Sequence, residues 1–238
     1  MEETVVITGA SRGIGLATAS YLAARGVNVI GLARRAPEQD FPGKFHNVDL
    51  TDQEEAGRIL MEIAATSPVT GLVNNVGMAS GESLDDLSLE TLHAVLALNV
   101  RIAVQATAAL VPGMRRQGFG RIINVASVVA LGAPNRTSYS AAKAAMLGMT
   151  KSWALELATD RITVNAVAPG PIETEFFRSL NPPGSTGESN YLKQIPVGRL
   201  GKPDEIATAI FFLIKQSGFI TGQTLYVDGG WSIGRQSI

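Results

Sequence analysis

The sequence contains no cysteine and only two histidines, His46 and His93, in 238 residues. The absence of cysteine excludes disulfide bonds and cysteine-based nucleophiles or metal sites, and it agrees with a reducing compartment. The two histidines are far apart, one in a predicted strand and one in a predicted helix, so we expect packing or surface roles for both. A histidine-based metal site or a Ser-His-Asp triad is therefore disfavoured, and no metal is expected.

Strong charge and long apolar runs are missing as well. The formal net charge is −1 with Lys and Arg scattered, so nothing indicates a nucleic acid partner. No segment approaches the roughly 18 to 20 uninterrupted apolar residues of a membrane span. The start, Met1-Glu2-Glu3, lacks the basic and apolar features of a signal peptide. We therefore expect a cytoplasmic protein with no membrane partner.

The sequence does contain an alternation of short β-branched runs with helix-forming segments. Strands are predicted at residues 4–8, 26–32, 44–48, 69–73, 121–127, 161–167 and 224–228, and helices at about 16–25, 52–65, 88–111, 138–158 and 203–215. Such alternation predicts right-handed βαβ units and a parallel sheet whose carboxyl ends gather at one rim. Because there is no linker, low-complexity tract or internal repeat, we expect one domain over residues 1–238.

A glycine-rich turn joins the first predicted strand to the first predicted helix. It reads Gly9-Ala10-Ser11-Arg12-Gly13-Ile14-Gly15. Glycines permit a tight turn and a close approach of the backbone to a phosphate, and the helix amino terminus adds unpaired N–H groups and a favourable dipole. The spacing differs from the usual Gly-x-Gly-x-x-Gly fingerprint. We expect this turn to hold an anionic dinucleotide; the alternative is a glycine turn without a ligand.

The second predicted strand ends in Ala33-Arg34-Arg35, without the Asp or Glu that takes the ribose hydroxyls of NAD in a dinucleotide fold. An arginine here accommodates the 2′-phosphate of NADP, and Arg34, helped by Arg12 and Arg35, can form charge-assisted bonds to it. We therefore predict NADP, with NAD less favoured. The alternative is a pair of solvated arginines at the end of a strand.

Further polar groups follow the next two predicted strands. Asp49-Leu50 follows the third strand and Asn74-Asn75-Val76-Gly77 follows the fourth. They suit either the adenine and ribose of a ligand or plain turns. Asn99 lies inside the helix predicted over 88–111, where its amide competes with backbone hydrogen bonds. A local distortion of that helix that holds a water would satisfy it.

Tyr139 and Lys143 are four residues apart on the helix predicted over 138–158, so their side chains share one face. An ammonium beside a phenol lowers the pKa of the phenol from about 10, and such a tyrosine can exchange a proton with an alcohol or carbonyl. Ser127 closes the fifth predicted strand and would point into the crevice where α/β proteins bind ligands. Alone, Tyr-x-x-x-Lys is a weak motif, and the alternative is an ordinary surface helix.

A stiff loop follows the sixth predicted strand, where the nicotinamide end of a cofactor would lie. It reads Ala168-Pro169-Gly170-Pro171-Ile172-Glu173-Thr174. Beyond it the composition is loop-like, and we expect a substrate lid at about residues 175–200, with disorder as the alternative. Apolar residues that would contact substrate are Phe176, Phe177, Leu180, Tyr191 and Leu192.

In their order along the chain, these motifs resemble the short-chain dehydrogenase/reductase family in its shorter form, over essentially all of the sequence. The matching positions are the glycine turn, Asp49, Asn74 to Gly77, Asn99, Ser127, Tyr139, Lys143, Pro169, Gly170 and Thr174. Val76 is a departure, because the family most often has alanine there, but its backbone rather than its side chain would border the cofactor. The resemblance implies an α/β fold: one Rossmann-type doubly wound domain with seven parallel strands in the order 3-2-1-4-5-6-7 and helices on both faces.

The resemblance also implies a role for each site residue. Ser127 would hydrogen-bond the substrate oxygen, Tyr139 would donate or remove the proton, and Lys143 would lower the pKa of Tyr139 and bind the nicotinamide ribose. Asn99 would hold a water that links Lys143 to solvent. Asp49 would contact the adenine and Asn75 the adenosine-side ribose, while Ile172 and Thr174 would contact the carboxamide. Other expected cofactor contacts are Leu50, Val76, Gly77, Pro169 and Gly170.

The expected function is hydride transfer between NADP(H) and a ketone or secondary alcohol. The ending, Gly222 to Gly230, looks like the branch that includes 3-oxoacyl-carrier-protein reductases, so a 3-oxoacyl thioester is the narrower candidate. The first alternative is an NAD-dependent alcohol, polyol or sugar dehydrogenase, and the second is a non-catalytic dinucleotide sensor. Because family members commonly form tetramers through the helices after strands four and five, a homotetramer or homodimer is expected.

Overall fold

Seven parallel strands form one sheet in the order β3-β2-β1-β4-β5-β6-β7 in the computed structural model, which describes residues 3–234. The strands are β1 (Thr4–Thr8), β2 (Asn28–Ala33), β3 (Lys44–Asn47), β4 (Gly71–Asn74), β5 (Gly120–Val125), β6 (Ile162–Pro169) and β7 (Thr224–Val227). The predicted fold and strand order are confirmed. The two ends of the domain predicted over 1–238, residues 1–2 and 235–238, lie outside the described residues.

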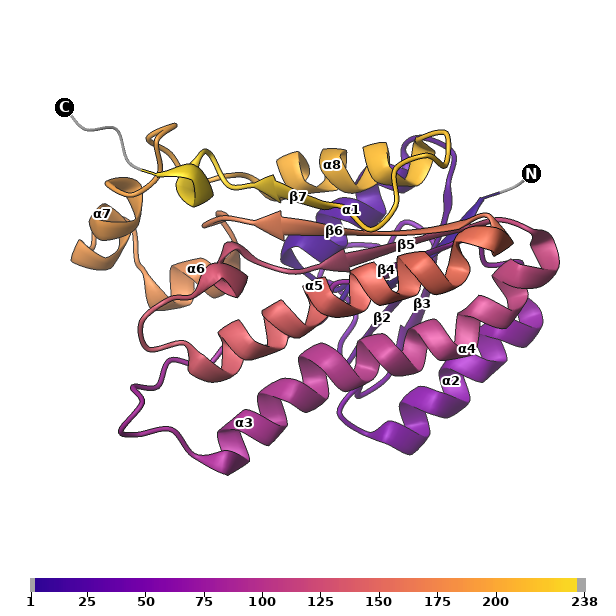
Figure 1. The fold of residues 1–238 in the computed structure, drawn as a ribbon, viewed down its shortest axis with the longest axis horizontal. Helices are drawn as coiled ribbons and strands as arrows, with labels where there is room; N and C mark the ends of the chain where they lie inside the picture. Colours follow the sequence, from indigo (N-terminus) through magenta and orange to yellow (C-terminus); the bar gives the residue numbers. More distant parts are fainter. Residues whose placement is uncertain (1–2, 235–238) are drawn as a thin grey trace.

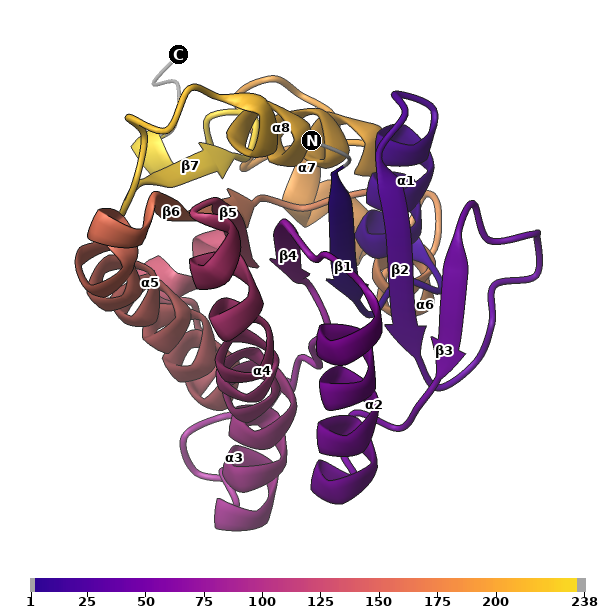
Figure 2. The same cartoon turned by 90° about the vertical axis from the view of Figure 1, so that its right-hand side faces the viewer.

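Helices cover both faces of the sheet (Figures 1 and 2). They are α1 (Gly13–Ala23), α2 (Gln53–Thr66), α3 (Leu89–Leu96), α4 (Ile102–Gln117), α5 (Thr137–Leu157), α6 (Glu175–Leu180), α7 (Thr186–Leu192) and α8 (Pro203–Lys215). Helices α1 and α8 lie on one face, and α2, α4 and α5 lie on the other. Strand side chains alternate between two cores: Val5 and Ile7 pack with α1 and α8, whereas Val6 packs with α2 and α4. Burial on both faces explains why the strands read as continuous apolar runs.

The connection from β2 to β3 is unusual for parallel strands, because residues 34–43, all within the described part of the chain, contain no helix. Phe41 and Phe45 pack edge to face, with ring centroids 5.1 Å apart, and join the core on the α1 side. Gly31 makes room for them, since a Cβ there would lie 2.5 Å from Phe41 Cζ. The two phenylalanines therefore cover sheet surface that a crossover helix normally covers.

The single helix predicted over 88–111 is in fact α3, a π-helical turn η1 (Ala97–Arg101) and α4, which run on as one rod (Figure 1). The predicted distortion at Asn99 is thus confirmed as a π-turn. By length and composition alone, Leu89–Gln117 is long and apolar enough to cross a membrane, although polar residues such as Asn99 and Arg101 interrupt its apolar positions. In the structure it behaves as a core helix, because Ala106, Leu110 and Met114 of α4 are fully buried.

The loop structure predicted from the composition of residues 175 to about 200 is wrong for much of that segment. Helices α6 and α7 form there, at the end of the molecule to which the strands point (Figure 1). Each begins with a hydroxyl cap that composition alone did not reveal: Thr174 accepts from the Phe177 N–H, and Ser185 accepts from the Glu188 N–H. Short capped helices escape prediction because they offer too few turns for a clear periodicity.

Candidate active site

The glycine turn between β1 and α1 is shaped by close backbone contact. Gly9 has φ +69°, which favours glycine, and a Cβ on Gly15 would lie 2.2 Å from the Gly9 carbonyl oxygen. Arg12 precedes α1 with extended backbone and makes no side-chain capping bond within residues 3–234. The first amides of α1 therefore face the turn without a side-chain cap, as an anion-binding helix terminus requires.

Asn75 and Thr8 hold this turn against the end of β4. Thr8 Oγ1 accepts hydrogen bonds from the N–H groups of Asn75 and Val76, at 3.0 and 3.1 Å. The Asn75 amide donates in return to the carbonyl oxygens of Thr8 and Gly9, at 3.0 and 3.1 Å. The structure thus gives Asn75 a role in positioning the turn, and its predicted ribose contact stays a prediction. The contribution of Thr8 was missed by sequence reasoning.

A cavity of about 910 Å³ extends from the glycine turn along the carboxyl ends of β2, β3 and β4. Predicted cofactor residues that line it are Gly9, Ser11, Arg12, Arg34, Arg35, Asp49, Leu50, Asn75, Val76 and Gly77. Sequence reasoning missed residues 36–39, Leu98 and Glu175, which also line it. The sequence did contain a signal for residues 36–39. Too few residues separate β2 from β3 for a crossover helix, so the carboxyl ends of these two strands are left uncovered.

Arg34 and Asp49 lie together at the edge of this cavity. The backbone N–H and hydroxyl of Thr51 donate to Asp49 at 2.9 and 2.8 Å, and with the charge of Arg34 they hold the pKa of Asp49 below its usual value. Arg12 forms a 3.8 Å ion pair with Glu175 of α6 across the cavity lining. The uncapped helix start, the glycine cradle and these arginines fit an anionic dinucleotide that carries an additional phosphate.

The remaining predicted cofactor residues lie outside the cavity lining. Thr174 lies 3.5 Å from the place of a Cβ on Gly13, so the glycine turn and the start of α6 adjoin. Gly170 packs tightly on Asp228, where a Cβ would approach to 2.7 Å. Ile172 pairs with Gly201 in a β-bridge and lines a separate cavity of about 130 Å³. The contacts predicted for these residues, and for Ile14 and Pro169, stay predictions.

Ser127 and Tyr139 meet beyond the end of β5. Ser127 lies two residues past the strand that it was expected to close, and its hydroxyl caps the short helix η2 (Val128–Leu131) by accepting the Val129 N–H at 3.3 Å. Tyr139 is in the first turn of α5 and is hydrogen-bonded to Ser127. A hydroxyl pair at the carboxyl edge of a parallel sheet is suited to bind and protonate a substrate oxygen.

The prediction that Lys143 lowers the pKa of Tyr139 stays a prediction, and other groups dominate this pKa in the structure. Burial raises the pKa of Tyr139 to about 12, and the Ser127 hydrogen bond and the charge of Arg136 offset only part of that effect. The Lys143 ammonium instead donates to the Val125 carbonyl oxygen at 2.8 Å and lies 5.6 Å from the centroid of the Tyr139 ring. Burial also lowers the pKa of Lys143 to about 7, which weakens its charge near neutrality.

Asn99 is brought to Lys143 by the π-turn. Its amide donates to the carbonyl oxygens of Val95 and Met78, at 2.8 and 2.9 Å, while its buried Oδ1 has no partner among the described residues. A Cβ on Gly77 would lie 2.4 Å from Asn99 Oδ1 and 3.5 Å from Lys143 Nζ, so both polar atoms border Gly77. The arrangement leaves an acceptor near the lysine, and the predicted water at Asn99 stays a prediction.

Known proteins share this sequence and fold. The family model described as enoyl-(acyl carrier protein) reductase matches residues 9–232. The 3-oxoacyl-(acyl-carrier-protein) reductase FabG of Vibrio cholerae is 40% identical over 238 residues, covering 96% of each chain. The structure of ElxO with NADP bound is 28% identical, with a TM-score of 0.90 over 97% of this chain and 99% of that one.

The ligand-free aldohexose dehydrogenase of Thermoplasma acidophilum is 32% identical, with a TM-score of 0.91 over 100% of this chain and 96% of that one. These similarities span the glycine turn, the cavity and the Ser127, Tyr139 and Lys143 group together, in one chain of matching length. The chain belongs to the short-chain dehydrogenase/reductase family and is an oxidoreductase.

Proposed function

We propose that this protein is an NADPH-dependent reductase of ketones, with 3-oxoacyl thioesters as its substrate class. One observation carries the proposal: Ser127, Tyr139 and Lys143 lie at the end of a sheet whose neighbouring cavity is lined by arginines that would meet the 2′-phosphate of NADP. The similarity to the Vibrio cholerae enzyme, named for this substrate class, supports it. We also propose that residues 1–238 form one catalytic domain that acts in the cytoplasm.

Nicotinamide supplies the redox chemistry when bound, by exchanging a hydride with the substrate carbon. The chain supplies orientation and the proton. With a pKa of about 12, Tyr139 is protonated at neutral pH and can donate to the oxygen as charge builds there. Ser127 stabilises the same oxygen by a hydrogen bond, where electrostatic help is most effective. Asn99, through its unpartnered Oδ1, would hold the water that links Lys143 to solvent.

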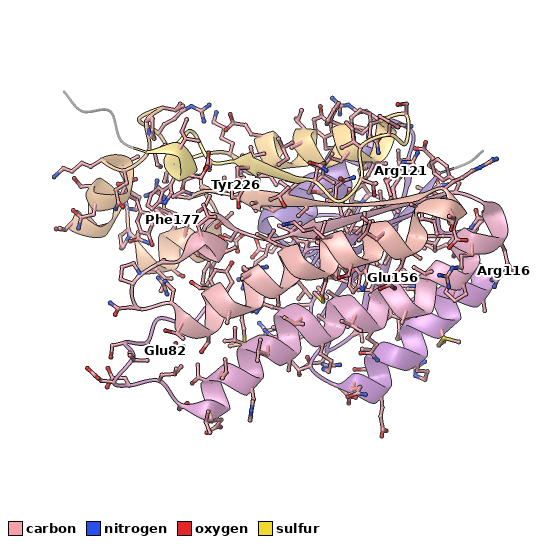
Figure 3. The ribbon with its side chains drawn as sticks, viewed as in Figure 1. Glu82, Arg116, Arg121, Glu156, Phe177 and Tyr226 are labelled. Atoms are coloured by element: carbon pink, nitrogen blue, oxygen red, sulfur yellow. The ribbon has the colours of Figure 1, made fainter. Side chains whose placement is uncertain are left out.

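We propose residues 175–200 as the lid over the substrate. Arg178 on α6 pairs with Glu173 in the preceding loop and, at 2.6 Å, with Glu188 on α7, which joins the segment into one unit. Phe177, labelled in Figure 3, packs edge to face on Tyr191, which in turn packs on Trp231. This aromatic cluster offers the apolar contacts that an acyl chain needs.

The test is a substrate panel followed by absorbance of the nicotinamide at pH 7. We expect NADPH oxidation with an acetoacetyl thioester and little with simple sugars. The similarity to an aldohexose dehydrogenase favours one alternative, in which NAD-linked oxidation of sugars is the faster reaction. Turnover of sugars but not of the thioester would overturn the proposed substrate. No turnover with any member of the panel would favour the sensor.

The cofactor preference is tested with Arg34→Asp. We predict that this substitution weakens NADPH binding by roughly tenfold or more while changing NADH binding much less, because it replaces the cation expected to meet the 2′-phosphate. Fluorescence titration with each cofactor measures both dissociation constants. Arg58→Asp on α2, an exposed arginine outside the cavity lining, is the control. Equal loss with both cofactors would refute the phosphate-binding role.

We further propose that the protein forms a homotetramer or homodimer through α4 and α5. The outer face of these helices exposes small residues and two larger apolar ones, Val104 and Leu155. Small residues on that face are Ala108, Ala141, Ala144 and Gly148. A stripe of small residues lets two helices approach closely, and burying it would remove apolar surface from water.

A further inference from the structure

Helix α5 carries both Tyr139 and Lys143 and begins at Thr137, only two residues before the tyrosine. The first amides of a helix lack partners inside the helix, and a side chain at the preceding position normally caps them. Arg136 holds that position, and its side chain makes no capping bond within residues 3–234. The helix end that locates Tyr139 therefore depends on a group from another part of the chain.

Glu82, in the loop between β4 and α3, supplies that group. Figure 3 shows it at the end of the molecule where α5 begins. Its Oε1 accepts hydrogen bonds from Ser138 Oγ at 2.5 Å and from Ser80 Oγ at 3.1 Å. Ser138 is fully buried. The Ser138 hydroxyl, the Ser80 hydroxyl and the Ser138 backbone N–H hold the pKa of Glu82 below its usual range, with help from the charge of Arg136. A carboxylate at this place also complements the helix dipole.

Arg136 fixes the same loop against the helix. Its Nη1 donates to the Ser80 carbonyl oxygen at 2.7 Å. A Cβ on Gly81 would lie 2.7 Å from that nitrogen, so the loop backbone lies directly on the guanidinium. The charge of Arg136 also acts to lower the pKa of Tyr139, which places it near the phenol. The loop after β4 is thus joined to the start of α5 at two places, Arg136 and Ser138.

We propose that Glu82 is a positioning residue for Tyr139. Its carboxylate holds the first turn of α5 through Ser138, and this keeps the tyrosine hydroxyl beside Ser127. The inference rests on the proposed function, because the benefit of a fixed phenol is proton transfer to the substrate oxygen. A misplacement of a reacting group by about 1 Å can cost about a hundredfold in rate, so a firm helix start matters.

The test compares Glu82→Ala, Glu82→Gln and Ser138→Ala with Asp85→Ala, which removes an exposed acid from the same loop. We expect Glu82→Ala to lower kcat with an acetoacetyl thioester by roughly tenfold, with NADPH binding changed less than about twofold. Glu82→Gln keeps the acceptor and should restore most of the rate. Amide hydrogen exchange should quicken in residues 137–143 of Glu82→Ala and Ser138→Ala only. Asp85→Ala should match the wild type in every measurement.

A double variant decides whether the two residues act as one unit. If Glu82 works through Ser138, Glu82→Ala with Ser138→Ala should lose no more rate than either change alone. Additive losses, an unchanged exchange rate in residues 137–143, or faster exchange throughout the protein would overturn the proposal. Absence of turnover in the wild type would count against the proposed function instead, while the exchange measurement would still test the cap.

Discussion

Burial drives the two ionisable residues at the centre of the site toward their neutral forms. The pKa of Tyr139 rises to about 12 and that of Lys143 falls to about 7. Tyr139 is then protonated at neutral pH, which is the form required to deliver a proton to a ketone oxygen. Lys143 donates a hydrogen bond to the Val125 carbonyl oxygen and is almost fully buried, and its lowered pKa means that it loses its proton close to neutral pH.

Tyr139→Phe removes the hydroxyl and little else. We predict that kcat falls by on the order of a hundredfold or more, because Tyr139 is the residue assigned to deliver the proton to the substrate oxygen. NADPH binding should stay largely intact, since the glycine turn and the arginine end are untouched. Steady-state kinetics and fluorescence titration measure the two effects, with Tyr21→Phe on α1 as the control. Near-normal turnover would contradict the assignment of Tyr139.

Lys143→Met should stabilise the fold in a pH-dependent way. The folded pKa of about 7 lies below the ordinary value of 10.5, so the unfolded chain binds more protons between these limits. The buried charge thus costs most below pH 7, and the cost fades as pH rises toward 10.5. We predict that the variant gains about 2 kcal/mol in free energy of unfolding at pH 6 and less at pH 9.

Urea unfolding at the two pH values measures this difference. Lys151→Met, which replaces an exposed lysine of the same helix, should show no such trend. A gain from Lys143→Met that is equal at pH 6 and pH 9 would contradict the assigned cause.

At the scale of elements, each part of the site lies at a junction between a strand and a helix or between two helical segments. The β1 to α1 turn, the end of β4, the π-turn η1 and the start of α5 all meet at the carboxyl edge of the sheet. The junctions tolerate few side chains, because backbone segments approach one another closely there. Gly15 shows this clearly, because a Cβ there would lie 2.2 Å from the Gly9 carbonyl oxygen, and a Cβ on Gly77 would lie 2.4 Å from the side-chain Oδ1 of Asn99.

Gly15→Ala tests the β1 to α1 junction. Its Cβ would meet the Gly9 carbonyl oxygen at 2.2 Å, so the turn must open. We predict that NADPH binding weakens by roughly tenfold or more, since the amides of the turn lose their alignment. Gly113→Ala in α4, where the nearest atom is 3.8 Å away, is the matched control and should bind normally. Unchanged binding by Gly15→Ala would argue that the cofactor lies elsewhere.

At the scale of the whole molecule, two surfaces are available for contact with another molecule. One is the cavity at the carboxyl edge, and the other is the outer face of α4 and α5, where Val104 and Leu155 are exposed. Large exposed apolar patches on a globular protein indicate contact with another molecule. The 83% exposure of Leu155 makes that residue the best reporter of such a contact.

Leu155→Lys should separate the proposed oligomer. A lysine in the middle of a close helix contact would bury an unpaired charge, so we predict a shift from tetramer to dimer or monomer. Light scattering after size-exclusion chromatography measures the mass. Met61→Lys on α2, 62% exposed in the wild type and away from that face, should leave the mass unchanged. A wild type that is already monomeric would refute the assembly.

Most of the fold was predictable because its signals are local. The alternation of strands and helices, the glycine turn and the Tyr139 to Lys143 spacing each span a few residues, and βαβ handedness then limits the topology to a few parallel sheets. Even the distortion at Asn99 followed from one polar residue within an apolar helix. By itself, then, the sequence determined a parallel sheet and the rim at which the site residues gather, while the strand order came from the family that its motifs resemble.

Only the tertiary structure decided the electrostatics and the supports of the site. Desolvation depends on atoms packed from distant elements, so the direction of the Tyr139 pKa shift could not be read from its helical neighbour. The short helices α6 and α7 are held by caps and by the Arg178 ion pairs. The bond from Ser138 to Glu82 joins residues 56 positions apart, a distance at which no local pattern carries information.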